Sequence, residues 1–210
     1  MPMPTIIIHV DGADLIAQLD ERGWTQEAWT NLNGAICAHQ AIRLCSPQPG
    51  DAYLIEQVAE RQGWGTGWND DRSTTEADVR GLLARGVDIT DGGLADTFGP
   101  QWRAVVAVVR MAATLTPNES VALPFQDSGW YSTWRAASVA ARHSARGSAW
   151  DAARAAAQGH VVARTAAGAV VVWDLASPEG PFTPALRDQL ISPWLAAQPD
   201  LLDHIVEVEQ

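Results

Sequence analysis

Apolar residues recur mostly every three or four positions along this chain, and one short β-branched run precedes that pattern. Residues 5–10 read TIIIHV, which predicts a strand. Asp11 follows and can cap a helix over residues 13–22, which Gly23 would end. The inward positions of this helix are Leu15, Ile16 and Leu19.

Two further helices are predicted on either side of a Pro- and Gly-rich break at residues 46–50. The first spans residues 26–44, because Trp29, Leu32, Ile36 and in part Cys37 and Gln40 follow a helical period. The second begins at Asp51, with Leu54 and Val58 on its inward side. It leads into a Trp- and Gly-rich loop at residues 63–71.

Capping and periodicity continue beyond that loop. Ser73 and Glu76 form a capping-box pattern for a helix that stops at Gly86. Its inward positions are Val79, Leu82 and Leu83. A short helical turn is expected at residues 94–98. The strongest helical pattern covers residues 101–114, with one apolar stripe of Trp102, Val105, Val106, Val109 and Ala113.

The second half of the chain is also expected to be helical. Residues 128–158 carry two Trp residues and then small residues on one face, which permits close helix packing. Residues 161–174 fit a helix or a hairpin, and a further helix is expected over 183–190. We therefore predict a mainly α fold, a single-domain helical bundle with a short N-terminal strand. Residues 1–46 would pack as one domain with a helical body over 47–210.

Composition supports a globular chain, since 47% of the 210 residues are hydrophobic. Neither a basic, apolar leader nor an apolar run long enough for a membrane span is present, so we expect a cytoplasmic protein with no membrane partner. All fourteen basic residues are Arg. Codon bias and selection against lysine both remain open as causes.

The formal net charge of −11 argues against a nucleic-acid partner, because phosphates would be repelled. Residues 130–164 are the exception, with five Arg and one acid for a net +4, which leaves −15 on the rest. Arg135, Arg142 and Arg146 share one helical face there. We expect this stripe to pair within the fold or with an acidic partner.

Few residues are candidates for binding a metal ion or a phosphate group. Cys37, His39 and Cys45 fall short of the four ligands of structural zinc, and no metal or other cofactor is expected. The glycines of residues 63–67 follow a predicted helix, not a strand, and precede two acids, which disfavours a phosphate loop. The nearby carboxylates of Asp70, Asp71, Glu76 and Asp78 lack calcium-loop spacing.

About two thirds of the chain, from residue 44 to 194, resembles uncharacterised Ala- and Trp-rich helical proteins of high-GC actinobacteria and their phages. The residues that carry the resemblance are LCSPQPGDAYLIEQV, WNDDRSTTEADVRGLLARGVDIT, FGPQWRAVVAVVR, SAWDAARAAA and FTPALRDQLISPW. This chain has one clear AWDAA segment, where the relatives often repeat it. The resemblance implies a helical body, favours a helix at 161–174, and brings no known function.

The sequence thus favours a non-enzymatic protein that binds another protein, with its oligomeric state left open. Trp64 and Trp68 are the predicted anchors, because they flank glycines in a loop where contact residues are commonly displayed. One alternative is an enzyme with a site assembled from scattered residues, for which His9, Asp11 and His39 are the first candidates. Another is an acidic inhibitor that mimics nucleic acid, which the interspersed Arg residues disfavour. No catalytic residue is assigned.

Overall fold

The computed structural model describes residues 5–26, 28, 30–99 and 101–114, and positions 168, 185, 188, 190 and 192. The chain divides into two compact units, Met1–Leu94 and Ala95–Gln210. The predicted packing of residues 1–46 with 47–210 as one domain stays a prediction. The protein is mainly helical with a short two-stranded antiparallel sheet near the N-terminus, which confirms the predicted fold class. The bundle arrangement stays a prediction.

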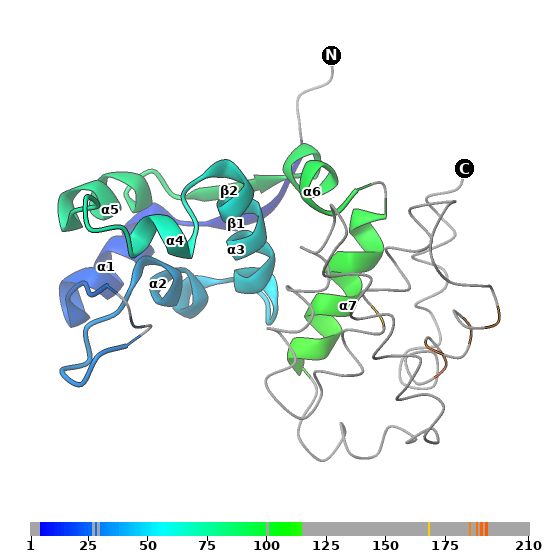
Figure 1. The fold of residues 1–210 in the computed structure, drawn as a ribbon, viewed down its shortest axis with the longest axis horizontal. Coiled ribbons are helices and arrows are strands. Elements are labelled where there is room, and N and C mark those ends of the chain that lie inside the picture. Colours follow the sequence, from blue (N-terminus) through cyan, green and yellow to red (C-terminus); the bar gives the residue numbers. More distant parts are fainter. Residues whose placement is uncertain are drawn as a thin grey trace. The chain divides into compact units, whose positions relative to one another are not determined.

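The sheet joins two segments far apart in the sequence, β1 (Ile6–Val10) and β2 (Val87–Thr90), which lie side by side in Figure 1. The strand predicted at residues 5–10 is confirmed. Along β1 the side chains of Ile8 and Val10 are buried while His9 between them is exposed, as the alternation of a half-buried strand requires. His9 lies directly opposite Asp88 in the register.

Helix α1 (Gly12–Arg22) follows the strand as predicted. The Asp11 carboxylate accepts a hydrogen bond from the backbone N–H of Ala13 at 2.7 Å, and Gly23 ends the helix at φ 82°. Leu15 and Leu19 are fully buried. The helix therefore packs its apolar stripe inward, against α2 and α5.

The start of α1 meets the turn before β2 backbone to backbone. A Cβ placed on Gly12 would lie 2.8 Å from the backbone nitrogen of Gly86 and 2.8 Å from the carbonyl carbon of Ala84. Gly86 itself has φ 74°, a conformation that glycine adopts without strain. These two glycines allow the chain to leave β1 and to enter β2 at the same end of the sheet, with the two backbones in close contact.

The helix predicted over residues 26–44 is wrong in its first half, because α2 spans only Ala38–Cys45. Before it, Ile36 forms isolated bridges with Trp24 and Thr30. Leu32, expected to face inward, is fully exposed. Trp29 lies outside the described residues.

Local side-chain bonds explain why this stretch is not helical. The Asn31 side-chain oxygen accepts hydrogen bonds from the backbone N–H groups of Asn33 at 2.9 Å and Ala35 at 3.0 Å. Gly34 has φ 86°, which a helix does not allow. Such side-chain bonds compete with helical ones and favour turns.

Three helices follow, α3 (Asp51–Gln62), α4 (Thr66–Asn69) and α5 (Glu76–Leu83). The predicted start of α3 is confirmed. The loop expected at residues 63–71 instead contains the helical turn α4. The capping box of α5 is formed by Thr75 and Asp78, so the predicted pair of Ser73 and Glu76 is wrong by two residues.

Helix α6 (Asp91–Phe98) contains the boundary between the units, and α7 (Trp102–Thr114) lies within the second unit. The α7 prediction is confirmed, and Trp102, Val105, Val106 and Val109 of its stripe are buried. The predictions for 128–158, 161–174 and 183–190 fall outside the described residues, apart from isolated positions. Across the described residues, no helix combines the length and apolar character that crossing a bilayer requires.

Candidate functional site

Trp64 and Trp68, the predicted anchors, lie on the segment that connects α3 to α5, and both side chains are partly exposed. The indole N–H of Trp64 donates to the side-chain oxygen of Gln62 at 2.9 Å. The backbone N–H of Trp68 donates to the carbonyl of Gly65 at 3.0 Å, the first bond of α4. One indole therefore precedes this helical turn and the other is part of it.

A fully buried asparagine fixes the turn to the rest of the unit. The side-chain oxygen of Asn69 accepts hydrogen bonds from the indole N–H of Trp24 and from the backbone N–H of Ala38, both at 3.2 Å. Its side-chain nitrogen donates to Asp70 at 2.8 Å. Because α4 has only four residues, such bonds supply the order that its own helical bonds cannot.

Gln26 holds the residues after α4 in a similar way. Its side-chain nitrogen lies within hydrogen-bond distance of three backbone carbonyls, those of Asn69 at 3.0 Å, Asp71 at 2.9 Å and Thr74 at 3.2 Å. The Thr74 hydroxyl donates to the carbonyl of Trp68 at 2.7 Å. Asn69 therefore holds the end of α4, and Gln26 and Thr74 hold the residues that follow it.

Carboxylates surround this turn. Glu56 accepts from the Thr66 hydroxyl at 2.9 Å, and Glu60 accepts from the Gly67 backbone N–H at 3.4 Å. Asp71 is exposed and accepts two hydrogen bonds from Ser73, which lower the pKa of its carboxyl group. The indoles are thus displayed within a negatively charged part of the surface.

Gly65 and Gly67 differ in the room around them. A Cβ on Gly65 would collide with the Glu60 side chain, so this glycine permits the close packing of Glu60 over the turn. Gly67 is exposed, and a Cβ there would meet nothing within 4 Å. The position between the two indoles therefore opens onto solvent.

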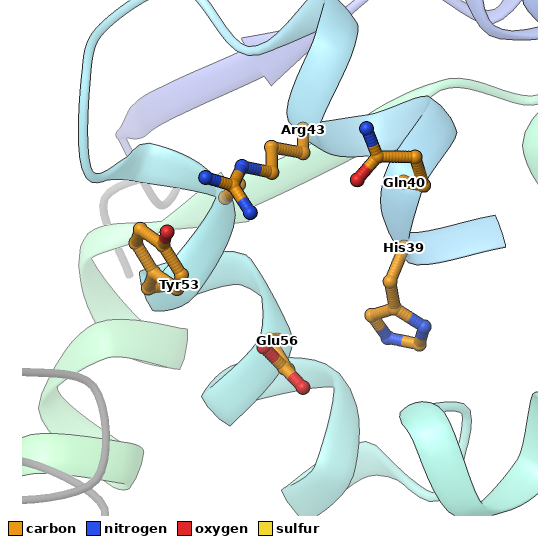
Figure 2. Close-up of a pocket in the computed structure, with 6 residues that line it drawn as sticks. His39, Gln40, Arg43, Tyr53 and Glu56 are labelled. Carbon is orange, nitrogen blue, oxygen red and sulfur yellow. The ribbon is translucent and has the colours of Figure 1, made fainter. Parts of the chain in front are cut away.

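A pocket lies between α2 and α3, lined by His39, Gln40, Arg43, Ala52, Tyr53 and Glu56. Figure 2 shows Arg43 and Tyr53 at one end, His39 and Gln40 at the other, and Glu56 between them. The guanidinium carbon of Arg43 lies 5.4 Å from the centre of the Tyr53 ring, within cation–π range. The sequence singled out only His39 from this set.

His39 is the unusual member of the pocket. Only 8% of its surface is exposed, and within the described structure neither ring nitrogen has a hydrogen-bond partner. Burial lowers the pKa of the imidazole, and the carboxylates of Glu56, Glu60 and Asp70 offset part of that effect. The ring is therefore neutral at pH 7, with one donor and one acceptor.

The other enzyme candidates lie elsewhere. His9 Nδ1 is 2.6 Å from a carboxylate oxygen of Asp88, and this hydrogen bond raises the pKa of His9, as do the charges of Asp88 and Asp11. Both His9 and Asp88 are more than half exposed at the side chain. His9 and Asp11 thus belong to an exposed strand end and His39 to the pocket, so the described contacts do not join them into one site.

The two cysteines are reduced and lie at the two ends of α2. Cys37 is buried, caps the helix through its sulfur, and has its thiol pKa raised by burial, as does Cys45. Among the described side chains, no three His, Cys, Asp or Glu residues gather as metal ligands would. Arg135, Arg142 and Arg146 lie outside the described residues.

Comparison of the chain with protein-family models, with curated proteins and with solved structures finds no match.

Proposed function

We propose that this chain is a protein-binding domain without chemistry of its own, and that Trp64 and Trp68 anchor its partner. The observation that carries this proposal is the pair of partly exposed indoles on a turn whose backbone Asn69 and Gln26 hold in place. Large aromatic side chains are enriched among the residues that contribute most to protein interfaces.

A fixed turn favours binding because less conformational entropy is lost when the partner docks. Trp has only two side-chain torsions and combines a large apolar body with one N–H donor, so it suits a half-exposed contact. The indole of Trp24, by contrast, donates to buried Asn69 and serves the fold. Of these three indoles, we therefore assign anchoring to those of Trp64 and Trp68.

The charge of the first unit suggests the chemistry of the partner. Residues 1–94 contain fourteen acids and six Arg, a net −8, and Glu56, Glu60 and Asp71 lie around the turn. Complementary charges favour specific and rapid association. We accordingly propose a partner surface that offers an apolar recess for the indoles and basic side chains around it.

The experiment places a photo-reactive amino acid at position 67, between the indoles, and at position 81 on α5 as a matched control. Both are exposed glycines beside which a Cβ meets nothing within 4 Å, so a side chain can start at either position without a collision at its Cβ. We expect a host protein to cross-link from position 67 and not from position 81. Its affinity is then measured with purified proteins.

Against that partner, Trp64→Ala and Trp68→Ala should each weaken binding by at least about thirtyfold, the effect of losing an interface hot spot. Their urea midpoints should stay near that of the parent chain. Normal affinity in both variants would show that the indoles do not anchor the partner, and unfolding of both would show that they serve the fold. Binding that responds to salt but not to either substitution would favour the nucleic-acid-mimic alternative instead.

A further inference from the structure

His39 is a buried titratable side chain without a hydrogen-bond partner among the described residues. Only 8% of its surface is exposed, and both of its ring nitrogens are buried. The free space in the pocket that it lines is about 10 Å³, which holds about one water molecule and no larger ligand. The charge that a second proton would bring to the ring must therefore be met by side chains of the protein itself.

Three carboxylates are placed to meet that charge. Glu56 and Glu60 lie one helical turn apart on α3, Asp70 follows the last residue of α4, and all three favour the charged form of the ring. Arg43 of α2 and Tyr53 of α3 line the other end of the pocket, as Figure 2 shows. In the described structure α1, which also packs against α2, contributes none of the charges that act on the ring.

Two of these carboxylates also hold the helical turn α4. Glu56 accepts a hydrogen bond from the Thr66 hydroxyl at 2.9 Å, and Glu60 accepts one from the Gly67 backbone N–H at 3.4 Å. These donors are the first two residues of α4, and both are neutral. A hydrogen bond from a neutral donor is weaker than one from a charged donor to the same carboxylate. The two glutamates thus connect the surroundings of His39 to the turn that carries the indoles.

We infer that protonation of His39 loosens the helical turn α4, so that the display of Trp64 and Trp68 depends on pH. An imidazolium ring has two N–H donors, and its hydrogen bond to a carboxylate is charge-assisted. Glu56 lines the same pocket, so the charged ring draws this carboxylate away from Thr66. A helical turn of four residues has few bonds of its own with which to replace the one that it loses.

The direction of the switch follows from the burial of His39. Burial lowers the pKa of the imidazole, and the three carboxylates offset part of that effect. The ring is neutral at pH 7, where Glu56 and Glu60 hold α4, and it takes up a proton in acid, where they are drawn toward it. Release of a bound partner in acid rests on the proposed function, whereas the change in the turn does not.

The test follows the full chain without any partner, by ¹H–¹⁵N NMR from pH 7 toward pH 5. The ring signals of His39 report its protonation, and the indole signals of Trp64 and Trp68 report the turn. We expect the indole signals to shift with the same midpoint as His39. Protection of the Asn69 backbone amide, which donates to Gly65 within the turn, should fall by about tenfold against solvent exchange.

Two results of this titration would overturn the inference. One is that the indole signals and the Asn69 protection stay unchanged while His39 titrates. The other is a His39 ring that remains neutral until the chain unfolds. An unresponsive turn overturns the inference even if a partner binds through the indoles, and a responsive turn supports it even if no such partner exists.

Variants show which group is responsible. His39→Gln removes the titrating ring, so the indole signals should no longer shift between pH 7 and pH 5. His9→Gln is the matched control and should respond as the parent does, because His9 pairs with Asp88 on the sheet. Equal shifts in His39→Gln and the parent would assign the response to another group and overturn the inference.

Glu56→Gln provides a second test if His39→Gln fails to fold. Its carboxamide oxygen can still accept from Thr66, but it carries no charge to attract the imidazolium. Most of the pH-dependent shift of the indole signals should therefore be lost. A shift as large as that of the parent would contradict the role given to Glu56.

Discussion

The indole N–H of Trp24 donates a hydrogen bond of 3.2 Å to the side-chain oxygen of Asn69, a residue 45 positions later in the chain. The same oxygen accepts the backbone N–H of Ala38, the first residue of α2. One amide group thus joins the segment before α2, the start of α2 and the turn α4.

Replacement of Asn69 by Ala should destabilise the first unit by about 2–4 kcal/mol, because a buried donor and a partly buried indole N–H lose their acceptor. Urea denaturation followed by Trp fluorescence measures the loss. Asn33→Ala is the matched control, since Asn33 is exposed and its only described bond is made by its backbone. Equal midpoints for the two variants would contradict the role assigned to Asn69.

The Asn69→Asp variant keeps the hydrogen-bond acceptor of this side chain and removes its hydrogen-bond donor. The carboxylate can still accept from Trp24 and Ala38, but it cannot donate to Asp70 and adds a like charge beside it. We expect this variant also to be destabilised at pH 7, and to recover part of the loss in mild acid, where the new carboxyl group can protonate. Full stability at pH 7 would show that the bond to Asp70 is unimportant.

Gly12→Ala should destabilise the protein by about 1–3 kcal/mol, because the new methyl group collides with the backbone of Ala84 and Gly86, which cannot move aside as a side chain could. Gly81→Ala on the exposed face of α5 should instead stabilise it by up to about 1 kcal/mol, the helix-propensity difference. Thermal unfolding of both variants tests the pair. An unchanged stability of Gly12→Ala would contradict the close contact between the start of α1 and the turn before β2.

Thr75→Ala should cost about 1 kcal/mol of stability, because Thr75 and Asp78 cap α5 reciprocally. Ser73→Ala should stay within about 0.5 kcal/mol, since the Ser73 hydroxyl only donates to exposed Asp71. Chemical denaturation distinguishes the two. A larger loss for Ser73→Ala would restore the capping box that the sequence predicted.

His39 should make stability depend on pH. Burial lowers its pKa below the unfolded value of 6.5, so the unfolded chain binds the proton more tightly than the folded one. The contribution of His39 is therefore present above pH 6.5 and is lost as pH falls through the folded pKa. The difference in unfolding free energy between the parent and His39→Gln should shrink from pH 7 toward pH 5. A constant difference would contradict this.

His9 should behave in the opposite sense. Its hydrogen bond to Asp88 raises its pKa above 6.5, so its stabilising effect is complete below pH 6.5 and is lost as pH rises through the folded pKa. The parent should exceed His9→Gln in stability by more at pH 6 than at pH 9. Because both side chains are exposed, salt should reduce the effect. No change with pH would mean that the pair does not form in solution.

The sequence predicted those elements whose signals are local. Asp11 caps α1, Asp51 starts α3 and the stripe of α7 is buried, because capping and periodicity act over one or two helical turns. β2 was missed, since four residues give too short an alternation to identify a strand. Its partner lies some eighty residues away, beyond the reach of any local pattern.

The wrong helix over residues 26–44 has a specific cause. The spacing of Leu32 and Ile36 fits a helical period, yet the intervening Asn31, Asn33 and Gly34 favour turns. In the structure these polar residues prevail, and Leu32 points to solvent. Apolar spacing alone therefore does not decide between a helix and a turn where Asn and Gly lie between the apolar positions.

The candidate sites were predictable to different degrees. Trp64 and Trp68 stood out by composition, and both are partly exposed, but binding through them is a proposal. The α2–α3 pocket was missed, because its recognition requires knowing which faces of two helices meet. One signal was present in the spacing of His39 and Arg43, four residues apart and hence on the same side of a helix.

The pairing of β1 with β2 also bears on how the chain folds as it is synthesised. His9 and Asp88 are separated by 79 positions, so β1, which is synthesised before β2, has no partner strand until nearly the whole of unit 1 has been made. During that interval the apolar run of residues 6–8 has no strand to pair with and is open to contact with other chains. Closing so long a loop also favours slow folding. We expect α1, α2 and α3 to gather first and the sheet to form last.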